Sequence, residues 1–143
     1  MRGEKGYTLV EMLLVLFMTG ILLTWVVFSV NPTKASTDEK VFVSQLQSDL
    51  AYVQSYAFRY QIPVRISFYP ENGSYIAKNV LNETVFNRKL QEGFEIKSST
   101  LYDITFYPNG NTNRFGSVNF ARGGTKYQLT FQIGQGRYYV QKK

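Results

Sequence analysis

The chain has 143 residues, a net charge of +6 at pH 7, and neither cysteine nor histidine. These two absences exclude disulfide frameworks, thiolate or imidazole catalysis, and metal sites built from Cys and His. Aromatic residues make up 16% of the chain, a content that argues against disorder. Residues 101–143 carry six Lys and Arg against one acid, whereas residues 34–100 carry eight against seven. This asymmetry favours an anionic partner for the last third of the chain.

An almost continuous apolar run extends from Tyr7 to Val30, and Glu11 places a carboxylate inside it. As a helix these residues would span about 36 Å, which exceeds a bilayer core of about 30 Å. We therefore predict a membrane-spanning assembly helix over residues 7–31. A carboxylate in such a helix costs up to about 3 kcal/mol at the membrane centre, and less near an end, so Glu11 is expected to have a partner.

Two basic residues, Arg2 and Lys5, precede the apolar run. The positive-inside rule then predicts a cytoplasmic N-terminus, with residues 34–143 outside the cell. The run is longer than the apolar core of a secretory signal, and no small-residue cleavage site follows it. The plain alternative is a signal anchor that contains an acidic residue by accident.

The segment Gly6-Tyr7-Thr8-Leu9-Val10-Glu11, followed by the apolar run, resembles the N-terminus of type IV pilins and pseudopilins, although that family has Phe where Tyr7 stands. The resemblance implies that a membrane peptidase cuts after Gly6, removes the cytoplasmic leader of residues 1–6, and methylates the new amino group of Tyr7. It also implies that Glu11 is the assembly carboxylate. In a filament Glu11 would pair with the Tyr7 amino group of a neighbouring subunit, an attraction that low dielectric strengthens.

Beyond the apolar run, Pro32 removes a helical hydrogen bond and predicts that the helix either kinks or breaks there. Apolar residues then recur at helical spacing, and they predict an amphipathic helix over residues 32–60. Polar residues, among them Gln45 and Asp49, lie between the apolar positions. The apolar stripe consists of Val41, Phe42, Leu46, Leu50, Val53 and Ala57.

From residue 61 onward the apolar period changes to two, and short strands alternate with Gly-rich and Asn-rich turns. In the first strand, Val64, Ile66 and Phe68 alternate with polar or amphipathic residues, namely Arg65, Ser67 and Tyr69. Seven further strands are predicted near residues 74–80, 83–90, 94–98, 104–106, 115–120, 127–133 and 138–141. The sequence thus predicts an α+β fold, in which a long N-terminal helix packs on an extracytoplasmic antiparallel β domain of residues 61–143. Two small sheets would resemble the minor pseudopilins with a larger β domain.

The C-terminal segment of residues 127–137, with the closing Lys142-Lys143, resembles the ComGD family of minor pseudopilins from the DNA-uptake machinery of Gram-positive bacteria. The resemblance implies a non-enzymatic subunit without cofactors that assembles with major and minor pseudopilins into a competence pseudopilus for transformation. Its further partners would be the prepilin peptidase/methyltransferase, the membrane assembly platform and membrane lipid, and it would reach the cell surface once assembled.

Three other functions remain open. The first two are a minor pseudopilin of a type II-like secretion system and a minor type IV pilin. The third is a membrane-anchored enzyme, which would need a carboxylate pair or Ser/Lys chemistry that the sequence does not concentrate anywhere.

Candidate contacts to DNA are Arg114, Arg122, Lys126 and Arg137, which lie among aromatic residues in the last third. Basic groups neutralise phosphates and exposed aromatic rings stack on single-stranded bases. The same residues are also compatible with a solvated basic edge that discourages sheet aggregation, or with contact to an anionic wall polymer or an acidic neighbouring subunit. The scattered carboxylates show no local pattern for calcium, and no metal site is predicted.

Overall fold

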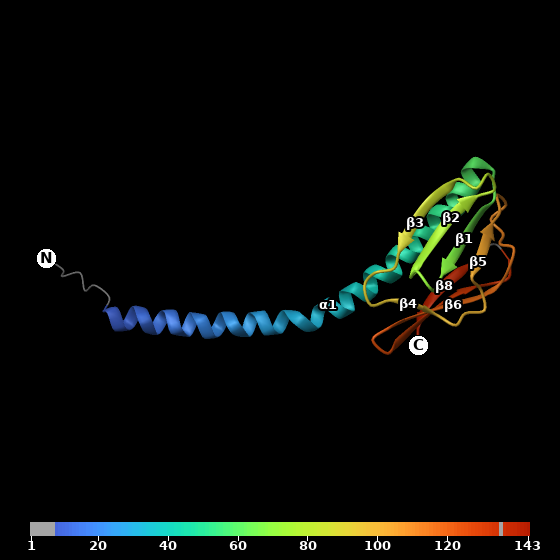
Figure 1. Ribbon diagram of the computed structural model, residues 1–143. Coiled ribbons are helices and arrows are strands. Elements are labelled where there is room, and N and C mark those ends of the chain that lie inside the picture. Colours follow the sequence, from blue (N-terminus) through green and yellow to red (C-terminus); the bar gives the residue numbers. More distant parts are fainter. Residues whose placement is uncertain (1–7, 135) are drawn as a thin grey trace. The chain divides into compact units, whose positions relative to one another are not determined.

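The computed structural model describes residues 8–134 and 136–143, and for residues 26–36 it describes the backbone alone. A single helix, α1 (Leu9–Tyr60), is followed by eight strands (Figure 1). The strands are β1 (Val64–Tyr69), β2 (Ser74–Asn79), β3 (Thr84–Lys89), β4 (Glu95–Lys97), β5 (Asp103–Phe106), β6 (Gly116–Arg122), β7 (Thr125–Phe131) and β8 (Tyr138–Lys142). The chain divides into two compact units, one ending at residue 40 and one of residues 41–143.

The strands of the second unit form two four-stranded sheets. The order is β3-β2-β1-β5 in the first sheet and β4-β6-β7-β8 in the second, and the paired strands are antiparallel. The chain passes between the sheets three times, from β3 to β4, from β4 to β5 and from β5 to β6. The predicted α+β fold, with a long helix on antiparallel sheets, is confirmed.

Each of the eight predicted strand segments overlaps an observed strand, and the largest shift is in β7. The prediction placed this strand at residues 127–133, whereas β7 is Thr125–Phe131. The reason is that the turn before it consists of Gly123 and Gly124 alone, with φ of 51° and 87°. Two successive residues with positive φ give a tight hairpin turn that suits the twist of the flanking strands. Arg122 consequently belongs to β6 and not to the turn.

Helix α1 runs through Pro32 without interruption, which excludes the predicted break. The side chain of Pro32 lies outside the described residues, and a bend at this position stays a prediction. The predicted leader of residues 1–6 and its neighbour Tyr7 also lie outside the described residues.

In the second unit the predicted apolar stripe of α1 forms one wall of the core. Phe42, Leu46, Leu50, Val53 and Ala57 are all at most 3% exposed, and they belong to one cluster with the inward-facing side chains of both sheets. Val41 does not belong to this wall, because it is 47% exposed. One residue step turns a helix by about 100°, so Val41 and Phe42 cannot face the same sheet.

Aromatic rings join the three layers of this unit. Phe42 of α1 stacks on Phe94, with ring centroids 3.9 Å apart, and meets the edge of Phe120 in β6 at 5.3 Å. Phe120 in turn makes an edge contact with Phe68 of β1 at 6.1 Å, which connects the second sheet to the first. Phe120 is fully buried and therefore lies where the helix and both sheets meet.

Asp49 lies between the apolar positions of the stripe, yet it is only 5% exposed. The hydroxyl of Tyr75 in β2 donates to the Asp49 carboxylate at 2.6 Å, and Gln45 donates to it at 2.9 Å. Arg88 of β3 completes the set with an ion pair of 3.3 Å. Burial first, and then the hydrogen bond to Asp49, raise the pKa of the Tyr75 phenol well above its usual range. This network fixes the helix on the first sheet at a polar point inside the core.

Candidate functional site

The described part of the N-terminal motif begins with a helix cap. Thr8 precedes α1, and its hydroxyl oxygen accepts a hydrogen bond from the backbone N–H of Glu11 at 3.3 Å. The carbonyl of Thr8 accepts the bond from the N–H of Met12 at 3.2 Å, the first of the helical ladder. Thr is among the preferred N-cap residues for this reason. Glu11 is thereby held in the first turn of α1, where a carboxylate interacts favourably with the helix dipole.

The Glu11 side chain is exposed, and so is the apolar surface around it. Leu9, Val10 and Leu13 have 77%, 70% and 60% of their surface exposed, and large apolar residues continue in this way to Trp25 at 77%. Among the side chains that the structure describes, no Lys or Arg forms an ion pair with Glu11. Apolar patches of this extent mark surfaces that bind a membrane or another protein. This surface, with the Glu11 carboxylate in it, therefore suits contact with membrane lipid or with another protein.

The two processing residues, Gly6 and Tyr7, lie outside the described residues. The predicted membrane span of residues 7–31 also extends over side chains that are not described, those of residues 26–31. Within the part of the chain that the structure does describe, no helix is both long and apolar enough to cross a membrane.

The four basic candidates for DNA contact separate into two pairs. Arg122 ends β6 and Lys126 lies near the start of β7, so both are at the hairpin that joins these strands. Arg114 precedes β6 and Arg137 precedes β8, at the other end of the same sheet. Strands of seven residues at about 3.3 Å per residue separate the two ends by roughly 20 Å. The four residues therefore do not form one patch.

Arg114 and Arg122 pack against neighbouring groups of the protein. Arg114 forms an ion pair with Asp103 of β5 at 3.0 Å. The guanidinium of Arg122 lies over the ring of Phe94, 5.1 Å from its centroid, and this position accounts for its partial burial. Lys126 and Arg137 are exposed. The structure thus gives Arg114 and Arg122 local packing roles, whereas Lys126 faces solvent.

A different basic surface, which the sequence reasoning missed, lies on the first sheet. Arg65 of β1 and Lys78 of β2 are directly opposite each other in the register of the sheet, over a groove. The alternation of residues 64–69 contained the signal for Arg65, because it placed Arg65 on the face opposite the core. It contained no signal for Lys78 as its neighbour, since pairing depends on the register between strands.

The described residues contain no group of three acidic side chains positioned to hold a metal ion.

Comparison with known proteins gives two sequence matches. Residues 1–27 match the family model described as the prokaryotic N-terminal methylation motif. The chain is also 33% identical over 141 residues to competence protein ComGD of Bacillus subtilis (strain 168). That match covers 98% of this chain and 95% of the relative.

Among solved structures the chain is similar to the type IV minor pilin FimU of Pseudomonas aeruginosa (strain PAO1) in two crystal forms. The TM-scores are 0.58 and 0.59, at 14% and 13% sequence identity. The matched part covers 71% and 78% of this chain, and 91% of FimU in both cases. At this identity the likeness concerns the fold alone. The chain has the fold of a type IV minor pilin, and by its full-length similarity it belongs to the family of competence protein ComGD.

Proposed function

We propose that the chain is a minor pseudopilin, which assembles with other pilin-like subunits into a competence pseudopilus and serves DNA uptake. The observation that carries this proposal is the similarity to a competence protein along nearly the whole chain. The N-terminal methylation motif over residues 1–27 and the minor pilin fold, matched over 71% of the chain, also support it.

The proposal assigns processing to the start of the N-terminal motif and assembly to the surface around Glu11. Prepilin peptidase would cut after Gly6 on the cytoplasmic side and methylate the amino group of Tyr7. The apolar surface around Glu11 would be covered by membrane lipid before assembly and by the helices of neighbouring subunits afterwards. Residues beyond the apolar run would lie outside the membrane, and at the cell surface once the filament has formed.

The Glu11 carboxylate favours the transfer of the subunit from the membrane to the filament. A carboxylate surrounded by lipid lacks hydrogen-bond partners and a counter-charge, which makes its burial costly. Next to the methylated amino group of a neighbouring Tyr7, the same carboxylate gains a charge-assisted hydrogen bond. The Thr8 cap holds the helix terminus in shape, so Glu11 projects from an ordered first turn and not from a frayed end.

The absence of cysteine from the chain allows a direct test of assembly. Glu71 is exposed in the turn between β1 and β2, so Glu71→Cys supplies a single thiol without disturbing the core. We expect a membrane-impermeant maleimide to label this variant on intact competent cells, and the labelled chain to appear in the filament fraction sheared from them. Immunoblots of the fractions would measure the yield.

The cysteine-free parent chain is the matched control and should remain unlabelled. Deletion of the gene should abolish transformation while secretion of extracellular proteins continues, and the Glu71→Cys chain should restore transformation. Absence of the chain from sheared filaments would contradict the proposal, as would a loss of protein secretion with normal transformation.

A further inference from the structure

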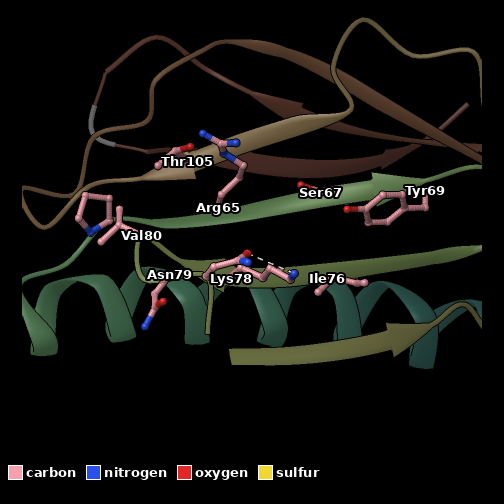
Figure 2. A pocket seen from close by; sticks show the side chains of 10 residues that line it. Arg65, Ser67, Tyr69, Ile76, Lys78, Asn79, Val80 and Thr105 are labelled. Atoms are coloured by element: carbon pink, nitrogen blue, oxygen red, sulfur yellow. Dashed lines mark hydrogen bonds between the residues drawn. The ribbon is translucent and has the colours of Figure 1, made fainter. Parts of the chain in front are cut away.

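The groove on the first sheet lies on the face opposite the buried core. Its volume is about 430 Å³, which is within the range of about 300–1,000 Å³ typical of small-molecule sites. Figure 2 shows side chains from neighbouring strands above the same face. The residues that matter here are Arg65, Ser67 and Tyr69 of β1, Ile76 and Lys78 of β2, and Thr105 of β5.

The register of the sheet places two cations side by side. Arg65 is opposite Lys78 on one side and Thr105 on the other, so a hydroxyl and two positive charges form one row across three strands. Like charges directly opposite each other destabilise an antiparallel pair. Such a pair is stabilised when an anion binds between the two cations, because each cation then faces a negative charge.

The carboxylates that border the groove have other partners. Asp103, opposite Ser67 in the register, forms an ion pair with Arg114 at 3.0 Å. Glu83 accepts a hydrogen bond from the Asn79 amide at 2.7 Å. Within the set of described side chains, neither Arg65 nor Lys78 forms an ion pair, and Lys78 donates only to the amide oxygen of Asn82, at 3.3 Å.

An apolar surface adjoins these cations. Tyr69 is 41% exposed at one end of the groove, and Ile76 is partly exposed between Tyr69 and Lys78. An exposed tyrosine ring beside basic groups suits a nucleotide, because the base stacks on the ring while the cations hold the phosphate. A glycerol-phosphate wall polymer presents the same phosphodiester without any base, and it would leave Tyr69 and Ile76 unused.

We propose that this groove binds single-stranded DNA, with a backbone phosphate between Arg65 and Lys78 and a base against Tyr69. The choice of DNA rests on the proposed role in DNA uptake; the phosphodiester chemistry rests on the groove alone. Thr105 and Ser67 add hydroxyl groups that can donate to phosphate oxygens. The groove would thus be the DNA contact of this subunit, in place of the basic residues of the last third.

The test measures binding of the full-length chain, in a mild non-ionic detergent, to a fluorescein-labelled 20-nucleotide single strand by fluorescence anisotropy. Replacing both cations, Arg65→Gln with Lys78→Gln, should weaken binding about tenfold or more. It should also flatten the plot of log K against log salt by about 0.7, since the two cations hold one phosphate and each single-strand phosphate contact contributes about 0.7. Tyr69→Ala should weaken binding with no change in this slope.

The matched control removes two exposed charges from the second sheet, Lys126→Gln with Lys143→Gln, and should bind as the parent does. Equal binding by the Arg65/Lys78 variant, no binding by the parent, or an equal loss in the control would each overturn the proposal. Displacement of DNA by poly(glycerol phosphate), at equal phosphate content and more strongly than by unlabelled DNA, would assign the groove to wall polymer and also overturn it.

Two further measurements distinguish a loss of DNA binding at the groove from misfolding of the variant and from a failure of the proposed function. Unchanged circular dichroism and an unchanged melting temperature would show that the Arg65/Lys78 variant is folded. That variant should still enter sheared filaments, because the groove lies outside the N-terminal assembly motif. A failure to bind DNA with normal filament incorporation would refute the groove and leave the proposed function standing.

Discussion

Replacing Glu11 with Leu is expected to abolish incorporation of the chain into filaments, while membrane insertion and cleavage after Gly6 continue. An ion pair of about 4 Å separation contributes about 4 kcal/mol at an effective dielectric constant near 20. Its loss corresponds to roughly a thousandfold in the assembly equilibrium. The comparison to make is the amount of chain in the sheared filament fraction against the amount in membranes, by immunoblot.

Met12→Leu is the control for this substitution, because Met12 is the next residue in the same turn and is 55% exposed. It should assemble normally, which would show that an apolar change beside Glu11 is tolerated. If Glu11→Leu entered filaments as well as the control did, the carboxylate would have no part in assembly. An uncleaved Glu11→Leu chain would instead place Glu11 in recognition by the peptidase.

The second large effect is expected at Phe120, where α1 and the two sheets meet. Phe120→Ala should lower the free energy of unfolding by about 3–5 kcal/mol, through lost burial and the cavity left between Phe42 and Phe68. Urea unfolding followed by near-UV circular dichroism would measure the change. The midpoint should fall with little change in the slope of the transition.

Phe115→Ala is the matched control, because the same ring is 65% exposed there, immediately before β6. Its effect should stay within about 0.5 kcal/mol, as for most surface substitutions. Equal destabilisation by both changes would mean that Phe120 does not hold the helix and the sheets together. The account of the core would then be wrong.

The fold was predictable because its signals are local. The spacing of Phe42, Leu46 and Leu50 is helical, the alternation around Ile66 is that of a strand, and glycines mark the hairpin turns. Each signal depends on neighbours within a few residues, as periodicity and turn chemistry do. The N-terminal motif could be recognised for the same reason, since Gly6 and Glu11 lie in one short segment.

What the sequence could not supply depends on contacts between distant residues. Asp49 is buried because Tyr75 and Arg88, which follow it by 26 and 39 residues, reach its carboxylate. The basic groove exists because register places Arg65 opposite Lys78. Conversely, the excess charge of the last third divides between the two ends of the second sheet, because Arg122, Lys126, Lys142 and Lys143 lie at one end and Arg114 and Arg137 at the other. Charge counted along a sequence says little about charge on a surface.

The central claim is that this chain is matured and assembled as a pseudopilin, and the intact mass of the protein from membranes of a competent host tests it most directly. The account predicts the loss of residues 1–6 and the gain of one methyl group on an N-terminal Tyr7. A full-length, unmethylated chain in a host whose prepilin peptidase is active would contradict it. Glu11 would then be an acidic residue in an ordinary membrane anchor, and the assembly mechanism would fall with the processing site.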